Sequence, residues 1–309
     1  MAKKPNDVDL RYTQNFLHSK TLVAKIVKLA TIPAGSVVLE IGGGAGIITH
    51  QLVDAVGRDG RVVVVELDKN FARKLRDTFK DAPQVEIITA DILQFDLTRF
   101  DAHYRVFANI PFSITATLLE HLFDPQHAPL SAHLILQQDT LMGTNKRGDT
   151  TETLKSLMIK PFYEIEVAYR FNRIDFNPAP SIDTALFAFT RRPEALIQAS
   201  QFAVYKDFMA YVSKDRVGEG VWKRVFSKKQ LTRLTDQTEL VMNRGIKSQS
   251  LNAIVDAFQI FVGHNQSKLS LIQGAMSNLR DEQQRREKMN RAGGHHASKQ
   301  REPTYKRKK

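Results

Sequence analysis

The sequence predicts an α/β protein built on a Rossmann-like parallel sheet, with a small helical domain after it. In the first 190 residues, short runs of β-branched residues alternate with segments of helical spacing, which is typical of parallel strands joined by crossover helices. After RRP at 191–193, no further strand run occurs and apolar residues recur at helical intervals. A chain of 309 residues that is 42% hydrophobic is long enough for two cores.

Five strands are expected in the first half of the chain. Their sequences are apolar throughout instead of alternating, which favours strands that are covered on both faces. They are VVLEI at 37–41, RVVVVEL at 61–67, VEIIT at 85–89, YRVFANI at 104–110 and AHLILQ at 132–137. Helical spacing between them predicts helices at 71–79 and 114–123.

The chain from Thr140 to Lys160 has no clear periodicity, and we expect a loop before or within a helix there. Two further runs, at 164–171 and 184–190, flank the proline-rich turn NPAPS. We expect them to form a strand pair at the edge of the sheet.

The second half predicts helices at 202–212, 231–242 and 250–262. We therefore expect a sheet domain at 1–190, a helical domain at 191–279 and a basic tail at 280–309. The tail has 11 basic and 4 acidic residues, and we expect it to be disordered.

Positive charge is concentrated in the helical half. Residues 1–190 carry 21 basic and 22 acidic side chains, whereas residues 191–309 carry 24 basic and 11 acidic ones. Such a concentrated positive field is typical of a nucleic-acid partner, so we expect the helical domain at 191–279 to bind RNA. A basic surface that only maintains solubility is the alternative.

Composition also limits the class of protein. The sequence has no cysteine, which excludes disulfides, thiolate zinc sites and cysteine nucleophiles. No apolar run approaches the roughly 18 residues that a membrane span needs, and the first residues lack an apolar signal segment. We expect a cytoplasmic protein without a membrane or metal partner.

A glycine-rich segment, EIGGGAG at 40–46, follows the first expected strand and precedes a helix. Glycines there allow a ligand to approach the backbone at a helix N-terminus. The dinucleotide fingerprint requires glycines at n, n+2 and n+5, but Ile47 or Thr49 occupies the last position, which disfavours NAD. The pattern that fits is E-x-G-x-G-x-G over Glu40 to Gly46, typical of class I S-adenosylmethionine-dependent methyltransferases.

Acidic residues follow the next two strands. Glu66 ends the second strand, where a carboxylate can accept the hydroxyl groups of a ribose. Asp91 follows the third strand, where it can accept a hydrogen bond from an adenine amino group. Either residue taken alone could be a solvated charge at a strand end.

The fourth strand is followed by Asn109, Ile110, Pro111 and Phe112. Proline favours an extended Ile110, so that the Ile110 carbonyl and the Asn109 side-chain oxygen can accept both hydrogens of an amino group. Phe112 offers a face on which a base can stack. Hydrogen bonds of this kind would favour a pyramidal amine that attacks a sulfonium methyl group. A simple turn is the alternative.

The chain resembles the rRNA adenine N6-methyltransferases over roughly residues 11–190. The motifs TQNFL at 13–17, EIGGGAG, VVVVELD, ADIL, NIPF and FNPAPSID at 176–183 occur in that family's order and spacing. Two branches share them, the erythromycin-resistance (Erm) enzymes of 23S rRNA and the dimethyltransferases of small-subunit rRNA. Ile110 within NIPF and the VFSKKQL run at 225–231 favour the Erm branch.

The resemblance implies a class I methyltransferase sheet, S-adenosylmethionine as cofactor and the following residue roles. Gln14, Asn15 and Phe16 contact the methionine end of the cofactor, together with Gly42 and Gly44. Glu66 holds the ribose, and Asp91 the adenine amine. Asn109, Ile110, Pro111 and Phe112 hold the target adenine, with Asn109 also at the cofactor, and Phe176 closes on the adenine from the other side. Phe176 could instead be a core residue.

The expected activity is methylation of N6 of one adenine in 23S rRNA, before full ribosome assembly, by a monomer. Macrolide, lincosamide and streptogramin B resistance would follow. Methylation of small-subunit rRNA is one alternative, and an RNA-binding scaffold that keeps the fold without catalysis is another. The segment LQQDTLMG at 136–143 departs from the family pattern, which leaves substrate placement near Thr140 open.

Overall fold

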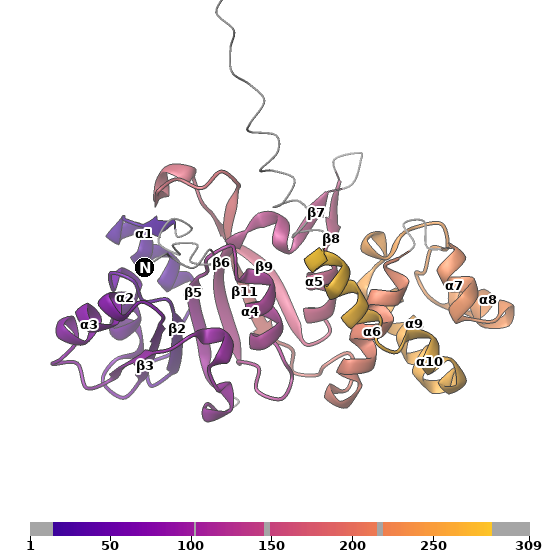
Figure 1. Ribbon diagram of the computed structural model, residues 1–309, viewed down its shortest axis with the longest axis horizontal. Coiled ribbons are helices and arrows are strands. Elements are labelled where there is room, and N and C mark those ends of the chain that lie inside the picture. The colour runs from indigo at the N-terminus through magenta and orange to yellow at the C-terminus, as the bar shows by residue number, and fades with distance from the viewer. Residues whose placement is uncertain (1–14, 102, 145–148, 215–218, 286–309) are drawn as a thin grey trace, which may run out of the picture. The chain divides into compact units, whose positions relative to one another are not determined.

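The computed structural model describes residues 15–101, 103–144, 149–214 and 219–285 (Figure 1). The chain divides into two compact units, Met1–Ala199 and Ser200–Lys309. The first unit contains the sheet, and the second is helical within the described residues. No helix in these described ranges is long and apolar enough to cross a membrane.

Seven strands form the main sheet of the first unit. Five of them are parallel and lie in the order β4-β3-β2-β5-β6, and β11 and β9 extend the sheet in antiparallel orientation. The bounds are Val37–Ile41 (β2), Arg61–Glu66 (β3), Val85–Thr89 (β4), Arg105–Asn109 (β5), Ser131–Gln137 (β6), Tyr163–Arg170 (β9) and Thr184–Arg191 (β11). The five parallel strands confirm those predicted from sequence, and the α/β Rossmann-like class is confirmed with them.

The strand order reverses direction between β2 and β5. Chain connections leave these neighbouring strands toward opposite sides, which opens a crevice at their carboxyl ends. The glycine-rich segment follows β2, and the NIPF segment follows β5. The topology therefore brings the two predicted motifs to the same edge of the sheet.

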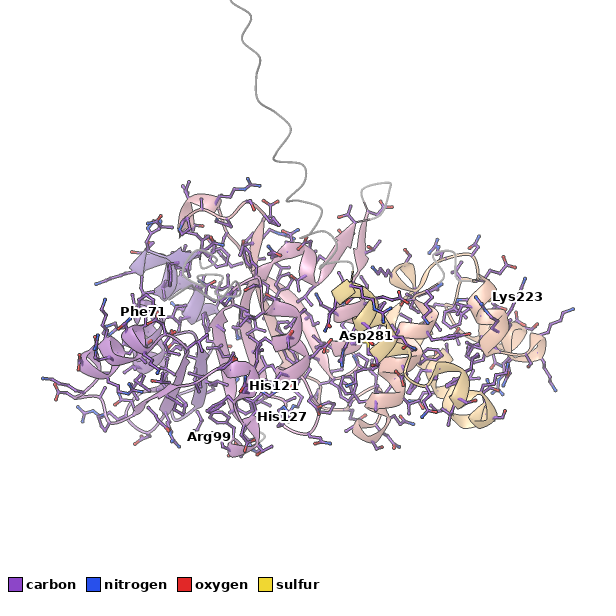
Figure 2. The ribbon with its side chains drawn as sticks, in the orientation of Figure 1. Phe71, Arg99, His121, His127, Lys223 and Asp281 are labelled. Carbon is purple, nitrogen blue, oxygen red and sulfur yellow. The ribbon has the colours of Figure 1, made fainter. Side chains whose placement is uncertain are left out.

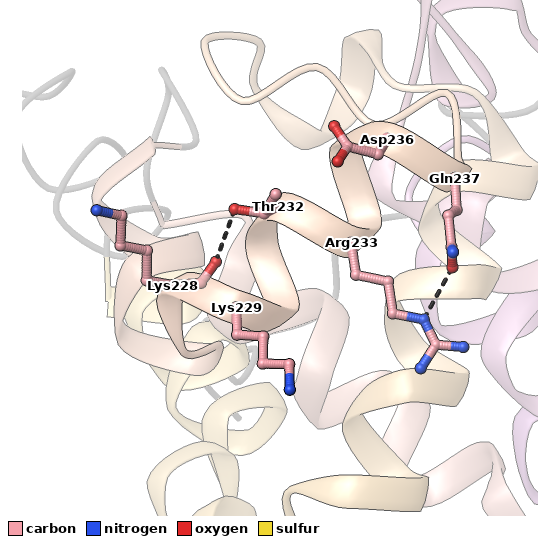
Figure 3. A pocket seen from close by; sticks show the side chains of 6 residues that line it. All are labelled: Lys228, Lys229, Thr232, Arg233, Asp236 and Gln237. Atoms are coloured by element: carbon pink, nitrogen blue, oxygen red, sulfur yellow. Dashed lines mark hydrogen bonds between the residues drawn. The ribbon is translucent and has the colours of Figure 1, made fainter.

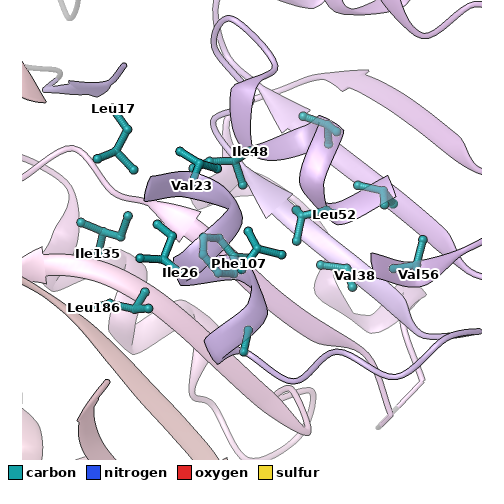
Figure 4. Packing of buried hydrophobic residues seen from close by; sticks show 14 of the residues in the cluster. Leu17, Val23, Ile26, Val38, Ile48, Leu52, Val56, Phe107, Ile135 and Leu186 are labelled. Carbon is teal, nitrogen blue, oxygen red and sulfur yellow. The ribbon is translucent and has the colours of Figure 1, made fainter. Parts of the chain in front are cut away.

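The helices of the first unit are α1 (Lys20–Leu29), α2 (Ile47–Val56), α3 (Lys69–Thr78), α4 (Thr115–Leu122) and the short α5 (Leu154–Ile159). Ser19 caps α1 by accepting from the Leu22 amide, and Asp68 caps α3 in the same way. One core lies between α1, α2 and the sheet, where Val23, Ile26 and Leu52 pack near Phe107 (Figure 4). Because this core is continuous, the sheet supports the loops at its edge rigidly.

For residues 140–191 one expectation is confirmed and one needs correction. The strand pair predicted at the edge of the sheet is present, because β11 and β9 pair in antiparallel orientation as the last two strands, with β9 outermost. The expected loop after Thr140 contains a hairpin of β7 (Met142–Thr144) and β8 (Thr150–Glu152), followed by α5. Thr153 starts α5 with a capping box to Ser156.

A second small sheet joins the start of the described chain to the FNPAPS segment. Phe16 and Leu17 form β1, which pairs with β10, Phe176–Asn177, in antiparallel orientation. His18 adds a contact of 2.8 Å from its Nε2 to the Ile174 carbonyl oxygen. The residues before the first helix are thereby fixed to a segment that follows β9.

The second unit contains α6 (Phe202–Val212), α7 (Glu219–Val225), α8 (Lys228–Gln237), α9 (Leu251–His264), α10 (Leu269–Ile272) and a helix over 275–285. Its core is aromatic, with Phe208 in ring contact with Trp222, Phe258 and Phe261. The helix expected at 231–242 begins earlier and ends at Gln237, because Thr238 is extended. The expected domain boundary at 190/191 falls inside β11, which continues to Arg191, and residues 286–309 of the expected tail lie outside the described chain.

Candidate functional site

A recess lies at the carboxyl ends of β2, β3 and β5. Its enclosed volume is about 40 Å³. Ten of its lining residues are ones that the sequence predicted: Asn15, Phe16, Gly42, Gly44, Glu66, Asn109, Ile110, Pro111, Phe112 and Phe176; Thr184 completes the lining. Segments more than 150 residues apart in the sequence thus meet at one edge of the sheet.

The glycine-rich segment forms one wall. Gly42 and Gly44 have positive φ angles of 75° and 52°, in the region that favours glycine. A Cβ at Gly42 would meet nothing within 4 Å, whereas one at Gly44 would lie 3.3 Å from Cε1 of Phe16. The backbone is therefore open beside Gly42 and closely covered by Phe16 at Gly44. Phe71 of α3, labelled in Figure 2, has its ring centroid 6.0 Å from that of Phe16.

Glu66 connects the ends of two loops. Its side chain is buried, and its Oε2 accepts a hydrogen bond of 2.9 Å from the Gly44 amide. Its Oε1 accepts one of 2.8 Å from the Asp68 amide. Each carboxylate oxygen retains a further lone pair for another donor. Leu67, the next residue, is 51% exposed and offers an apolar surface beside this carboxylate.

One predicted cofactor residue, Asp91, does not line the recess in the described structure, and another lies outside the described residues. Asp91 follows β4 as expected, but its Oδ1 accepts a hydrogen bond of 3.0 Å from the Leu93 amide and caps a short 3₁₀ turn. It is absent from the described lining, so its contact with adenine stays a prediction. Gln14 lies outside the described residues.

Asn109 is held by the N-terminal segment. Its Nδ2 donates a hydrogen bond of 2.8 Å to the Asn15 carbonyl oxygen. Because the amide nitrogen is used in this way, the amide oxygen remains as an acceptor at the recess. Ile110 is anchored by its own amide, which donates to the Ile135 carbonyl at 3.3 Å, and no described group donates to the Ile110 carbonyl. Two acceptors are therefore available side by side.

Phe112 and Phe176 both line the recess, but their surroundings differ. Phe112 is half-buried. Phe176 is 4% exposed, belongs to the hydrophobic core and has its ring centroid 5.1 Å from that of Phe171. Phe176 is thus a core residue as well as a wall of the recess.

Sequence reasoning assigned no separate role to Glu40, although it begins the glycine motif. Its side chain is 1% exposed within β2, and neither carboxylate oxygen has a hydrogen-bond partner in the described structure. Burial raises the pKa of Glu40 to about 8, the neighbouring Thr49 hydroxyl offsets part of this effect, and the Glu66 carboxylate adds to it. A charged residue inside the apolar run VVLEI was the available signal. Thr184 and Leu67 gave no comparable signal.

The described residues contain no cluster of three or more His, Cys, Asp or Glu side chains arranged to hold a metal ion. The groups that face the recess are backbone amides, one carboxylate, neutral acceptors and aromatic rings. This donor set suits a nucleoside-like ligand with hydroxyl and amino groups.

Comparison with known proteins agrees with this chemistry. The ribosomal RNA adenine dimethylase family model matches residues 6–262. The Ribosomal RNA small subunit methyltransferase A of Streptococcus thermophilus is 32% identical over 212 residues, 66% of this chain and 70% of the relative. An rRNA adenine N-6-methyltransferase of Lysinibacillus sphaericus is 26% identical over 261 residues, 84% of this chain and 100% of the relative.

A solved structure shares the fold. The 23S rRNA methyltransferase ErmE has a TM-score of 0.68 at 20% sequence identity, covering 80% of this chain and 100% of that structure. The family model spans most of the chain, including every residue that lines the recess. The chain therefore belongs to the ribosomal RNA adenine dimethylase family, which is a family of S-adenosylmethionine-dependent methyltransferases.

Proposed function

We propose that the chain transfers methyl groups from S-adenosylmethionine to N6 of an adenine in ribosomal RNA. The observation that carries this proposal is the pair of neutral acceptors at Asn109 and Ile110, beside the glycine wall and Glu66. Family membership supports the same reaction class.

The residues present fit the cofactor. Gly42 leaves open space where a side chain would otherwise stand, and Glu66 has acceptor capacity for ribose hydroxyl groups. Leu67 offers an exposed apolar face for a base. When bound, S-adenosylmethionine supplies an electrophilic methyl group on a sulfonium centre.

The adenine side of the reaction requires positioning, not a strong base. The Asn109 amide oxygen and the Ile110 carbonyl accept the two N6 hydrogens, which favours a pyramidal nitrogen with an available lone pair. Phe112 and Phe176 supply aromatic faces, and stacking on such faces is worth about 1–3 kcal/mol per base. This offsets the few kcal/mol needed to extrude a base from folded RNA.

We place small-subunit rRNA first as the substrate. Relatives named small-subunit rRNA methyltransferases include proteins of Streptococcus and Variovorax that are 31–32% identical to this chain. This support favours the small-subunit alternative over the 23S reading that the sequence motifs suggested.

A 23S rRNA adenine is the second candidate. Ile110 within NIPF and the run at 225–231 favour it. Drug resistance would follow only from this second substrate.

Methyl transfer to separate ribosomal substrates tests the proposal. Labelled S-adenosylmethionine is supplied with small subunits, with 23S rRNA, or with assembly intermediates of either subunit, and the modified base is mapped by primer extension. Erythromycin tolerance of a susceptible host that expresses the protein reports on the 23S site. If the protein binds RNA but modifies neither RNA, the proposed enzyme function is refuted and the RNA-binding scaffold is supported instead.

Asn109→Ala is expected to lower kcat by about 100-fold or more, because loss of one positioned transition-state hydrogen bond costs about 10²–10³ in kcat. Affinity for S-adenosylmethionine, measured by calorimetry, should fall much less than kcat. Asn252→Ala, an exposed asparagine on α9, is the control. Equal rates for the two variants would refute the role of Asn109.

A further inference from the structure

An open surface on α8 carries three positive charges and one negative charge. Six exposed residues line it, and we call it the α8 cationic face: Lys228, Lys229, Thr232, Arg233, Asp236 and Gln237 (Figure 3). It belongs to the helical unit, whereas the residues that form the recess belong to the first unit. None of these residues was given a role by the sequence motifs of the methyltransferase sheet.

The start of α8 is electrostatically unfavourable. Lys228 and Lys229 occupy the first turn, which contains no acidic residue. The N-terminus of a helix carries a partial positive charge, so lysines there are repelled while an anion is attracted. The sequence thus places positive charge where helix formation alone would disfavour it.

The same conflict recurs one turn later. Lys229 and Arg233 are four residues apart and extend from the same side of the helix, whereas Asp236 points away from Arg233 (Figure 3). Like charges at this spacing destabilise a helix. The helix is stabilised by other means, namely a capping box between Ser227 and Gln230 and two buried leucines.

Two cations on neighbouring helices of this unit have structural partners. Lys223 pairs with Glu219, and Lys268 donates to the carbonyl groups of Arg224 and Val225 at the end of α7. In the described part of the chain, Lys228 and Lys229 have neither an ion pair nor a side-chain hydrogen bond, and Arg233 has only a hydrogen bond from its Nε to Gln237. Their charges are free for an external anion.

We propose that the α8 cationic face binds the phosphodiester backbone of the RNA substrate, an inference that rests on the proposed function for the identity of the RNA. Phosphates are anions that a helix N-terminus and lysine side chains bind well. A membrane surface fits less well, because helices that lie on membranes present large apolar residues beside their cations. The exposed positions of α8 from 228 to 237 are Lys, Thr, Arg, Asp and Gln only.

The test measures RNA affinity at several salt concentrations. The probes are transcribed 16S rRNA, transcribed 23S rRNA and a non-ribosomal RNA of similar length. Each phosphate contact contributes about 0.7–0.9 to the slope of log affinity against log salt concentration. The triple variant Lys228→Gln, Lys229→Gln, Arg233→Gln is therefore expected to lower this slope by about 2–3 on all three RNAs.

The matched control removes three exposed cations from the first unit. Lys28 lies in the last turn of α1, and Arg58 and Lys80 follow the C-terminal ends of α2 and α3, at the sheet edge opposite the recess. Their replacement by Gln is expected to leave the slope unchanged. The variant Lys228→Arg, Lys229→Arg retains the charge and should retain the slope. Melting temperature should not fall in the α8 triple variant, because it removes repulsion within the helix.

An unchanged slope in the α8 triple variant would overturn the inference, and so would an equal decrease in the control. Loss of binding to vesicles of anionic phospholipid, with RNA binding intact, would also overturn it in favour of a membrane. A wild-type protein that binds RNA with the full slope but transfers no methyl group would refute the proposed function alone. Methyl transfer with an unaltered slope in the variant would refute this inference alone.

Discussion

The buried carboxyl group of Glu40 makes the stability of the first unit depend on pH. Its pKa is raised from 4.5 to about 8, chiefly by burial. Between these two pH values the unfolded chain releases the proton and the folded chain retains it, so the unfolded state is favoured as pH rises. Glu40 therefore destabilises the folded state most above pH 8, and this destabilisation disappears below pH 4.5.

The size of the effect follows from the two pKa values. Each pH unit between these two pKa values changes the free energy of unfolding by about 1.36 kcal/mol. Glu40 therefore lowers the free energy of unfolding by about 3 kcal/mol at pH 7 and by about 5 kcal/mol at pH 8, relative to pH 4.5. For a unit of this size, 3 kcal/mol corresponds to roughly 10 °C in melting temperature.

Glu40→Gln removes the titrating group with little change in volume. Thermal unfolding of wild type and variant is followed from pH 4.5 to pH 8.5, and the difference between the two melting temperatures isolates Glu40 from other titrating groups. The wild type is expected to lose stability relative to the variant as pH rises. Asp54→Asn, an exposed substitution on the same helix as Thr49, serves as the control. Parallel curves for wild type and Glu40→Gln would refute the reasoning.

Two further predictions concern stability. Burial, with a smaller effect from Arg105, lowers the pKa of His133 from 6.5 to about 4. The stability that the neutral ring contributes is therefore present above pH 6.5 and is lost as the pH falls to 4. In chemical denaturation, the free energy of unfolding of wild type should fall by about 3 kcal/mol over this interval relative to His133→Leu. Gly43→Ala would place a Cβ 2.5 Å from Cγ1 of Val64 and should destabilise by about 1–3 kcal/mol. Gly263→Ala on α9, where a Cβ meets nothing within 4 Å, should stabilise by about 0.5–1 kcal/mol. Equal shifts for the two glycine variants would contradict the packing argument.

The parallel strands could be predicted from sequence because both of their faces are covered, which requires continuous apolar runs. The edge position of β9 was also readable, since Glu164 and Glu166 alternate with apolar residues there, whereas the run at 184–190 is apolar almost throughout. The hairpin of β7 and β8 was not predictable. Its strands are three residues long, and so short a segment shows no periodicity.

The sequence predicted which residues line the recess better than it predicted how their side chains are oriented. Strand-end motifs indicated which residues gather at the switch point, because topology alone brings the ends of β2, β3 and β5 together. The orientation of Asn109 depends on a carbonyl 94 residues away, which no local pattern encodes. For Asp91 the local pattern was ambiguous, because an aspartate after a strand can cap the next turn as well as bind a ligand, and here it caps the turn.

The short pairing of β1 with β10 affects the order in which the protein acquires its parts during synthesis. The strands that form the cofactor wall are complete once residue 109 has emerged, but Phe176 and the partner of β1 follow more than 60 residues later. Asn15 and Phe16 must wait for that late segment before they can be covered. During synthesis the strand ends that carry the glycine segment, Glu66 and NIPF are therefore made well before the segment that covers Phe16, so that the recess closes only when β10 has been added.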